Sequence, residues 1–381
     1  MAYSTRYFGT TGGPSGSDGS DWNNRAPLLV GGTSGTWSGS LTGWNFGLSG
    51  SLLAYIGSGT YFPSVALSQT LFASPCGASG QLMFCGCDGS GNAIQPDLGW
   101  NSCEPEYDTS QFPVLVTNTN TNCFNLQQNF ATARCIYFLG NNITTNVMLR
   151  FCNASYCKVH GSTSCNNSNF ILHEANSKSY DSIYQFDGTQ AGPICGADPF
   201  GSRSIFTNTS ATAGKNFGNN NAPSIMYKCT GIRAPQNSVL NTSVSQGNLA
   251  TFWFDNTMFD CGATMAAFSL TGRNTSLGLI VNNYFADGPV GIDYLSFING
   301  ITINNRFRTF TTATFSGTAN NLFLFNQLTS GTDAEFVNGT GSTSGDLTIS
   351  SGATTVWGND YGVADQQPTG GGNRVGGFFF G

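Results

Sequence analysis

Charge is scarce in this sequence. Of its 381 residues, 9% are Asp, Glu, Lys or Arg, and the formal net charge is −6. The basic residues are scattered and form no Lys/Arg stripe, so we expect no nucleic-acid partner. No apolar run reaches the length of a membrane span. No basic and then apolar leader follows Met1, which we interpret as export without such a signal or release within an assembled particle.

Recognisable catalytic and cofactor motifs are also missing. The chain has 2 histidines and contains no G-x-S-x-G, H-E-x-x-H or phosphate-loop pattern. Its 12 cysteines lie between Cys76 and Cys261, at spacings that match no standard zinc pattern. We therefore expect no metal and no cofactor. The cysteines are expected to be disulfide-bonded or buried as thiols, and Cys152 and Cys157 are spaced to close a small loop.

The residues that are abundant favour strands and turns. The chain contains 50 Gly and 30 Phe, and Ser, Thr and Asn are frequent. One pattern recurs along it, which reads apolar, x, apolar, x, Asn, x, apolar. Clear copies occupy residues 252–258, 279–285, 301–307 and 322–328. A weaker copy, Phe336 with Asn338, precedes a further one at 355–361. Alternation with a period of two is typical of a β-strand and places the asparagine on the same face as its apolar neighbours.

An inward asparagine needs hydrogen-bond partners, and stacking can supply them. Isolated burial of its amide would be costly, but strands about 4.8 Å apart allow each amide to bond the next one. The asparagines at 256, 283, 305 and 326 are separated by 27, 22 and 21 residues, which suits one turn of a parallel β-solenoid. Upstream, the same register passes through Cys229, expected to be a small core residue. The predicted internal ladder is Asn141, Asn256, Asn283, Asn305, Asn326 and Asn359.

The segment Asn282–Phe285, with the repeat around it, resembles the right-handed parallel β-helix of the pectin-lyase-like superfamily. That superfamily includes polysaccharide-degrading enzymes, phage tailspikes and adhesins, and the resemblance implies an all-β solenoid. An antiparallel β-sandwich or jelly roll is the alternative fold. The expected organisation is a flexible arm over residues 1–26, a β-rich N-terminal region or capping coils over 27–112, the parallel β-helix over 113–362, and a Gly-rich tail with a terminal Phe cluster over 363–381.

The positions three residues before each ladder position are predicted to point outward. They form a mostly apolar column, which a monomer would expose to water. We expect this column to be covered by loops of the same chain, by a second copy in a homo-oligomer, or by a ligand. Its members are Met226, Trp253, Ile280, Thr302, Phe323 and Val356.

Function is less constrained by the sequence than the fold. Asp260 and Asp287 each lie four residues after a ladder asparagine, so stacking would bring them about 5 Å apart, a separation that suits a retaining glycosidase. Such residues more often bind turn amides, so the favoured hypothesis is a non-enzymatic structural protein. We expect a fibre, spike or surface subunit of a virus or phage, located on a virion or an extracellular surface, which assembles with its own copies and contacts host glycans. The alternatives are an extracellular adhesin or filament-forming glycoprotein, and a polysaccharide lyase or hydrolase.

Overall fold

The structure is a computed structural model, and it consists of β-strands with no helix in the part of the chain that it describes. The described residues are 3–16, 19–27, 51–61, 67–68, 82–96, 99–101, 104–106, 108–117, 124–125, 131–141, 149–150, 152–167, 173–174, 178–188, 190–191, 200–208, 217–219, 224–227, 229–234, 240–243, 250–254, 256–261, 266–271, 277–293, 299–316, 320–330 and 333–341. They fall into two compact units, which divide after Ala213.

In the first unit, parallel strands build three stacks. The first stack contains β1 (Tyr3–Gly9), β3 (Ser51–Gly57), β6 (Leu82–Cys87), β11 (Ala131–Arg134), β14 (Cys152–Ser155), β18 (Lys178–Tyr180) and β21 (Phe200–Ser202). The second contains β4 (Gly59–Tyr61), β9 (Pro113–Thr117), β12 (Tyr137–Gly140), β15 (Lys158–Gly161), β19 (Ile183–Phe186) and β22 (Ile205–Asn208). The third contains β5 (Leu67–Ser68), β10 (Phe124–Asn125), β13 (Leu149–Arg150) and β17 (His173–Glu174).

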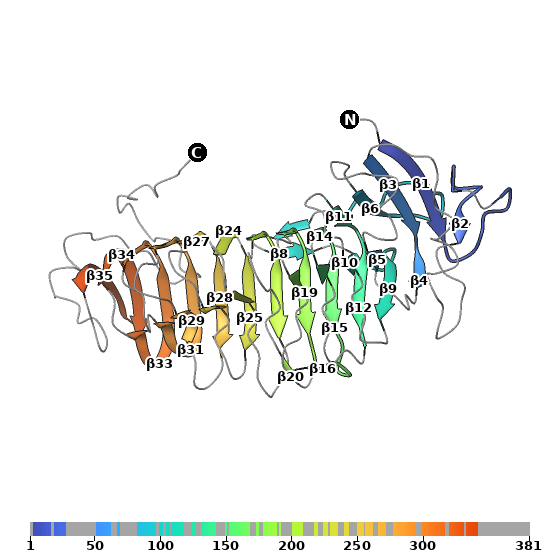
Figure 1. The fold of residues 1–381 in the computed structure, drawn as a ribbon. Coiled ribbons are helices and arrows are strands. Elements are labelled where there is room, and N and C mark those ends of the chain that lie inside the picture. Colours follow the sequence, from blue (N-terminus) through green and yellow to red (C-terminus); the bar gives the residue numbers. More distant parts are fainter. Residues whose placement is uncertain are drawn as a thin grey trace. The chain divides into compact units, whose positions relative to one another are not determined.

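Short strands complete this unit. β2 (Ala26–Pro27) pairs parallel with the end of β1, and β16 (Asn166–Asn167) pairs parallel with β20 (Gln190–Ala191). The antiparallel pair β7 (Gly99–Asn101) and β8 (Glu104–Glu106) lies between β6 and β9 in sequence. The chain visits the stacks in order, for example β11, β12 and β13 and then β14, β15 and β17. Figure 1 shows β12, β15 and β19 lying side by side. This order fits an all-β parallel solenoid.

The second unit repeats the arrangement. One stack contains β24 (Ser224–Tyr227), β27 (Ala250–Phe254), β30 (Leu277–Val281), β32 (Asn299–Ile303) and β34 (Asn320–Ser330). The next contains β25 (Thr230–Ala234), β28 (Thr257–Cys261), β31 (Tyr284–Asp293) and β33 (Arg306–Ser316), and the third joins β23 (Phe217–Asn219), β26 (Leu240–Ser243) and β29 (Ala266–Thr271) to the end of β31. An antiparallel strand, β35 (Asp333–Gly341), pairs with β34.

The predicted flexible arm is wrong for its strand-forming part. Tyr3 to Gly9 form β1, which pairs with β3 over its length, and Phe8 is fully buried. The segment after it folds back on itself, with the Gly13 amide donating to the Arg25 carbonyl. An apolar residue sealed against a neighbouring strand holds this part of the chain in place. The predicted tail over 363–381 lies outside the described residues.

The recurring pattern is two strands with a corner between them, and not one strand. In the copies at 279–285 and 301–307, the first strand ends at Val281 or Ile303, and the next begins at residue 284 or 306. Asn282 and Asn304 occupy the corner with φ values of 57° and 52°. Asparagine adopts this left-handed conformation more readily than most residues. The turn shifts the strand alternation by one position.

That shift overturns the predicted outward column. Met226, Trp253 and Ile280 are buried within the single chain, at 0%, 0% and 1% exposure. With the left-handed Asn282 at the corner, Asn283 and Ile280 face the interior together. Trp253 and Met226 follow Ile280 in the strand register, so no partner is needed to cover this column. Thr302 lies on β32 and Phe323 on β34, with both side chains outside the described set, and Val356 lies outside the described residues.

Candidate functional site

The inner corner of the second unit carries the predicted amide ladder. The Asn283 Oδ1 accepts from both the backbone amide and the Nδ2 of Asn256, at 2.9 and 2.8 Å. The Asn305 Oδ1 accepts from the same two groups of Asn283, at 2.8 and 2.9 Å. All three asparagines are at most 1% exposed. The ladder is thus confirmed for Asn256, Asn283 and Asn305, because each amide satisfies the next and a backbone amide as well.

The remaining ladder predictions have different outcomes. Cys229 is fully buried, and its amide donates to the Asn256 Oδ1 at 2.9 Å, so it fills a ladder position as predicted. Asn141 does not; it is half-buried just after β12, where its Oδ1 accepts from the Ser162 hydroxyl at 2.6 Å. Asn326 lies beside Asn305 in the backbone register, with its side chain outside the described set. Asn359 lies outside the described residues.

In the first unit, serine hydroxyls take the place of the amides. The Cys157 amide donates to the Ser182 Oγ at 3.1 Å, and the Ser182 amide donates to the Ser204 Oγ at 3.2 Å. Both hydroxyls also donate within their own strand ends, Ser182 to the Tyr180 carbonyl and Ser204 to the Ser202 carbonyl. Sequence reasoning missed this set, because serine is common in the chain and carries no distinctive pattern.

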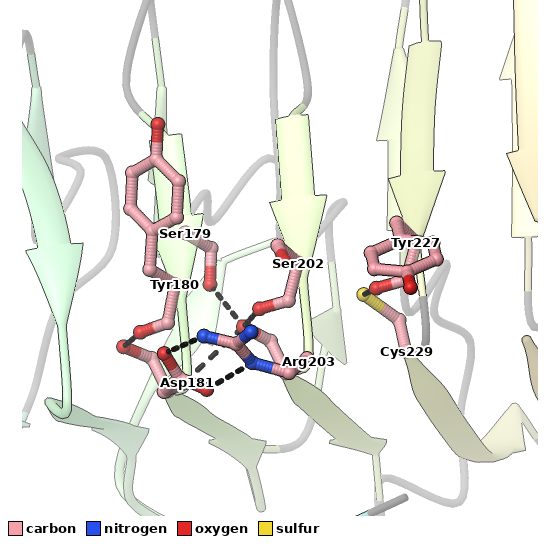
Figure 2. A network of polar contacts seen from close by, with 9 residues as sticks. Ser179, Tyr180, Asp181, Ser202, Arg203, Tyr227 and Cys229 are labelled. Carbon is pink, nitrogen blue, oxygen red and sulfur yellow. Dashed lines mark hydrogen bonds and ion pairs between the residues drawn. The ribbon is translucent and has the colours of Figure 1, made fainter. Parts of the chain in front are cut away.

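The residues just before these serines form an ion pair on the outer side of the corner. Asp181 and Arg203 both have left-handed backbones, with φ values of 47° and 46°. Arg203 donates through Nε and Nη2 to the two carboxylate oxygens of Asp181, at 2.6 and 2.7 Å (Figure 2). The Asp181 side chain is 3% exposed and that of Arg203 is 41% exposed. The guanidinium therefore covers a buried carboxylate and ties two successive turns of the chain together.

A second polar network crosses three strands on the outer face of the second stack. The His160 Nδ1 lies 2.8 Å from the Tyr137 hydroxyl, and its Nε2 lies 2.8 Å from the Asp187 Oδ2. The Gln185 Nε2 donates to the same Asp187 oxygen at 2.7 Å, and the Lys158 ammonium lies 4.9 Å from the centre of the Tyr137 ring. Side chains from β12, β15 and β19, with Asp187 directly after β19, thus form one continuous chain of hydrogen bonds.

Burial sets the protonation of this network. Desolvation lowers the pKa of His160; the hydrogen bond and charge of Asp187 oppose this effect, and the charge of Lys158 adds to it. Desolvation, with the Asp187 charge, raises the pKa of the Tyr137 phenol. The imidazole is neutral at pH 7 and the phenol keeps its proton. Because a carboxylate only accepts, Nε2 carries the imidazole hydrogen and Nδ1 accepts from the phenol. Such a phenol is a poor nucleophile.

The backbone positions of the predicted acid pair, Asp260 and Asp287, agree with the expectation that the two residues lie on adjacent stacked strands. β28 and β31 pair in parallel, and Phe259 lies opposite Ala286. Asp260 and Asp287 follow these two residues directly, so their backbones are neighbours on adjacent strands. Their side chains lie outside the described set, and no catalytic role follows from the backbone alone.

The described cysteines are buried thiols, so that expected state is confirmed and the alternative of disulfides is wrong for this part of the chain. Cys152 and Cys157 are fully buried thiols that form no disulfide with each other, so they close no loop. Burial raises the pKa of each, that of Cys152 to about 12. No group of His, Cys, Asp and Glu among the described residues is arranged to hold a metal ion. The other described cysteines without a disulfide are Cys85, Cys87, Cys135, Cys165 and Cys229.

Comparisons of the chain with protein-family models, with curated proteins and with solved structures find no match. In the described part of the chain, no helix has the length and hydrophobicity that crossing a membrane requires.

Proposed function

We propose that this chain is a non-enzymatic structural protein, a right-handed parallel β-helix that serves as a stiff subunit of a fibre, spike or particle surface. The observation that carries the proposal is the inner corner, where side-chain oxygens accept backbone amides from one turn of the chain to the next in both units. Such bonds resist bending and sliding of successive turns. The right hand follows the general rule for crossovers between parallel strands.

The interior supports a load-bearing role over a ligand-enclosing one. Side chains that face inward are large and sealed, among them Phe138, Tyr184, Trp253 and Phe285. A repeat architecture of this kind gains stability mainly from contacts between neighbouring turns. We extend the proposal to self-association and to a place in a viral or phage particle. Both extensions rest on composition, because a chain with 9% charged residues and 50 Gly is unusual for a globular enzyme.

Electron microscopy and sedimentation of the purified full chain test this function together. We expect elongated particles whose mass is two or more whole multiples of the chain mass. A monomer at every concentration would refute self-assembly, and a round particle of low axial ratio would refute an elongated, stiff subunit. Mass spectrometry of the native protein, by detecting attached glycans, would favour the extracellular adhesin or filament glycoprotein instead.

A polysaccharide lyase or hydrolase is the second candidate function, and its support is that the backbones of Asp260 and Asp287 are neighbours on adjacent strands. Its test is a screen of the full chain for cleavage of anionic and neutral polysaccharides. Any activity found must then be lost in both Asp260→Asn and Asp287→Asn. Activity that survives either substitution removes the carboxylate pair as its source.

A further inference from the structure

The Tyr137–His160–Asp187 network has features that a purely structural contact between strands does not require. It joins three successive turns through a single imidazole, with both ring nitrogens bonded at 2.8 Å. The side chains of His160 and Asp187 are 16% and 19% exposed, so water reaches them but does not surround them. Imidazole is the one side chain whose ordinary pKa makes it change charge between pH 5 and 8.

The hydrogen-bond arrangement is complete for one protonation state. With a neutral ring, Nε2–H donates to Asp187, and Nδ1 accepts the Tyr137 hydroxyl hydrogen. When the ring takes up a proton, both nitrogens become donors. The Tyr137 hydroxyl then has to turn its hydrogen away and accept from Nδ1 instead, so the hydrogen bond that this hydroxyl donates to the ring is lost.

The charges around the ring act in opposite directions. Asp187 favours an imidazolium, and Lys158, two residues before His160 on the same strand, disfavours it. Partial burial also disfavours the charged ring, and this is the largest of the effects. The groups that face His160 are Tyr137 and apolar Leu139 from β12, Lys158 from its own strand, Gln185 from β19, and Asp187 after it.

We propose that His160 is a proton-operated clamp, which holds β12, β15 and β19 together on their outer face when neutral and loosens that face when protonated. The sign follows from linkage. A histidine whose folded-state pKa is lowered binds fewer protons when folded than when exposed to water. Stability is therefore fully present above the ordinary value of about 6.5 and falls as the pH drops from there through the folded-state pKa. This inference goes beyond the proposed structural role, and either can fail without the other.

Nuclear magnetic resonance of the full chain labelled with ¹⁵N-histidine tests the protonation state. Since the chain has 2 histidines, His160 is assigned by comparison with His160→Gln. We expect the Nε2–H tautomer at pH 7.5 and a titration midpoint below 6.5. A midpoint at or above that value, or an Nδ1–H tautomer, would overturn the proposal, and this measurement on the unchanged protein stands even where a variant fails to fold.

Hydrogen exchange tests the clamp itself. After correction for the intrinsic pH dependence of exchange, we expect the amides of β12, β15 and β19 to lose protection on acidification from pH 7.5 to 5. In His160→Gln, whose amide can donate to Asp187 and accept from Tyr137 without taking a proton, that loss disappears. His173→Gln is the matched control and keeps it. An equal loss of protection in His160→Gln would show that the acid response arises elsewhere.

Discussion

Replacing Asn283 by alanine is expected to be among the most damaging single changes in the second unit. Its side chain makes four hydrogen bonds at 1% exposure: Oδ1 accepts from the backbone and side-chain nitrogens of Asn256, and Nδ2 donates to the Trp253 carbonyl and the Asn305 Oδ1. In the variant, the Asn256 Nδ2 still donates to the Met226 carbonyl, and the Asn305 Oδ1 still accepts from the backbone amide of residue 283. The Asn256 backbone amide loses its acceptor and stays buried.

The expected cost follows from these losses. A buried donor left unsatisfied costs about 1–3 kcal/mol, and each hydrogen bond lost with its partner otherwise satisfied costs about 0.5–1.5 kcal/mol. Asn283→Ala is therefore expected to destabilise by roughly 3–6 kcal/mol. The matched control is the preceding residue, Asn282→Gly. It removes one half-buried hydrogen bond to Asn304 and suits the left-handed backbone, so we expect a change of about 1 kcal/mol or less.

The measurement has to allow for a repeat architecture, which need not unfold in one step. Equilibrium denaturation gives the overall change, and native-state hydrogen exchange locates it. We expect the amides of β27, β30 and β32 to lose protection in Asn283→Ala and to keep it in Asn282→Gly. Stabilities within about 0.5 kcal/mol of each other for the two variants would refute the reasoning that the ladder carries load, since that is the range of an ordinary surface substitution.

Three further predictions concern other parts of the structure. Arg203→Met removes the cover of the buried Asp181 carboxylate and is expected to cost about 1–3 kcal/mol in thermal or chemical denaturation, whereas Arg203→Lys, which keeps the charge without the fork, is expected to cost less. Gly57→Ala sets a methyl 2.4 Å from the Trp22 ring and is expected to cost about 1–3 kcal/mol and shift tryptophan fluorescence; Gly89→Ala, with open space around it, leaves both unchanged. Buried thiols with raised pKa values are expected to resist alkylation at pH 7.5 until the chain unfolds. Rapid labelling of the native protein, detected by peptide mass spectrometry, would contradict their buried placement. The thiols concerned are those of Cys85, Cys87, Cys135, Cys152 and Cys157.

The parallel stacking and the amide ladder could be predicted from the sequence because the repeat interval can be read directly from it. Intervals of 27 and 22 residues between Asn256, Asn283 and Asn305 fixed which residues stack, and the hydrogen bonds follow that register. The corner was not recognised, although the pairs Asn282–Asn283 and Asn304–Asn305 carried its signal. Asparagine adopts the left-handed conformation more readily than most residues, and treating Asn282 as one more strand residue reversed the side on which Ile280 lies.

The His160 network escaped sequence reasoning for a different reason. Its members come from three turns, at residues 137, 160 and 187, and no local motif joins them. The register does join them once it is known, because β15 places His160 between Leu139 of β12 and Gln185 of β19. Asp187 is two residues further along the same face. Sites in a solenoid are therefore found by reading down a column of the register, after the corners have been placed.

The two units satisfy the same backbone need with different chemistry, and the difference has a mechanical consequence. A serine hydroxyl at the inner corner accepts from the preceding turn and donates within its own, as Ser182 does, so its bonds end locally. An asparagine amide accepts from the preceding turn and donates to the following one, as Asn283 does, so its bonds continue from turn to turn. Amides in series polarise one another and are each strengthened by their neighbours. Loss of one amide therefore weakens the turns on both sides, whereas loss of the Ser182 hydroxyl leaves a single amide of the preceding turn, that of Cys157, without its acceptor.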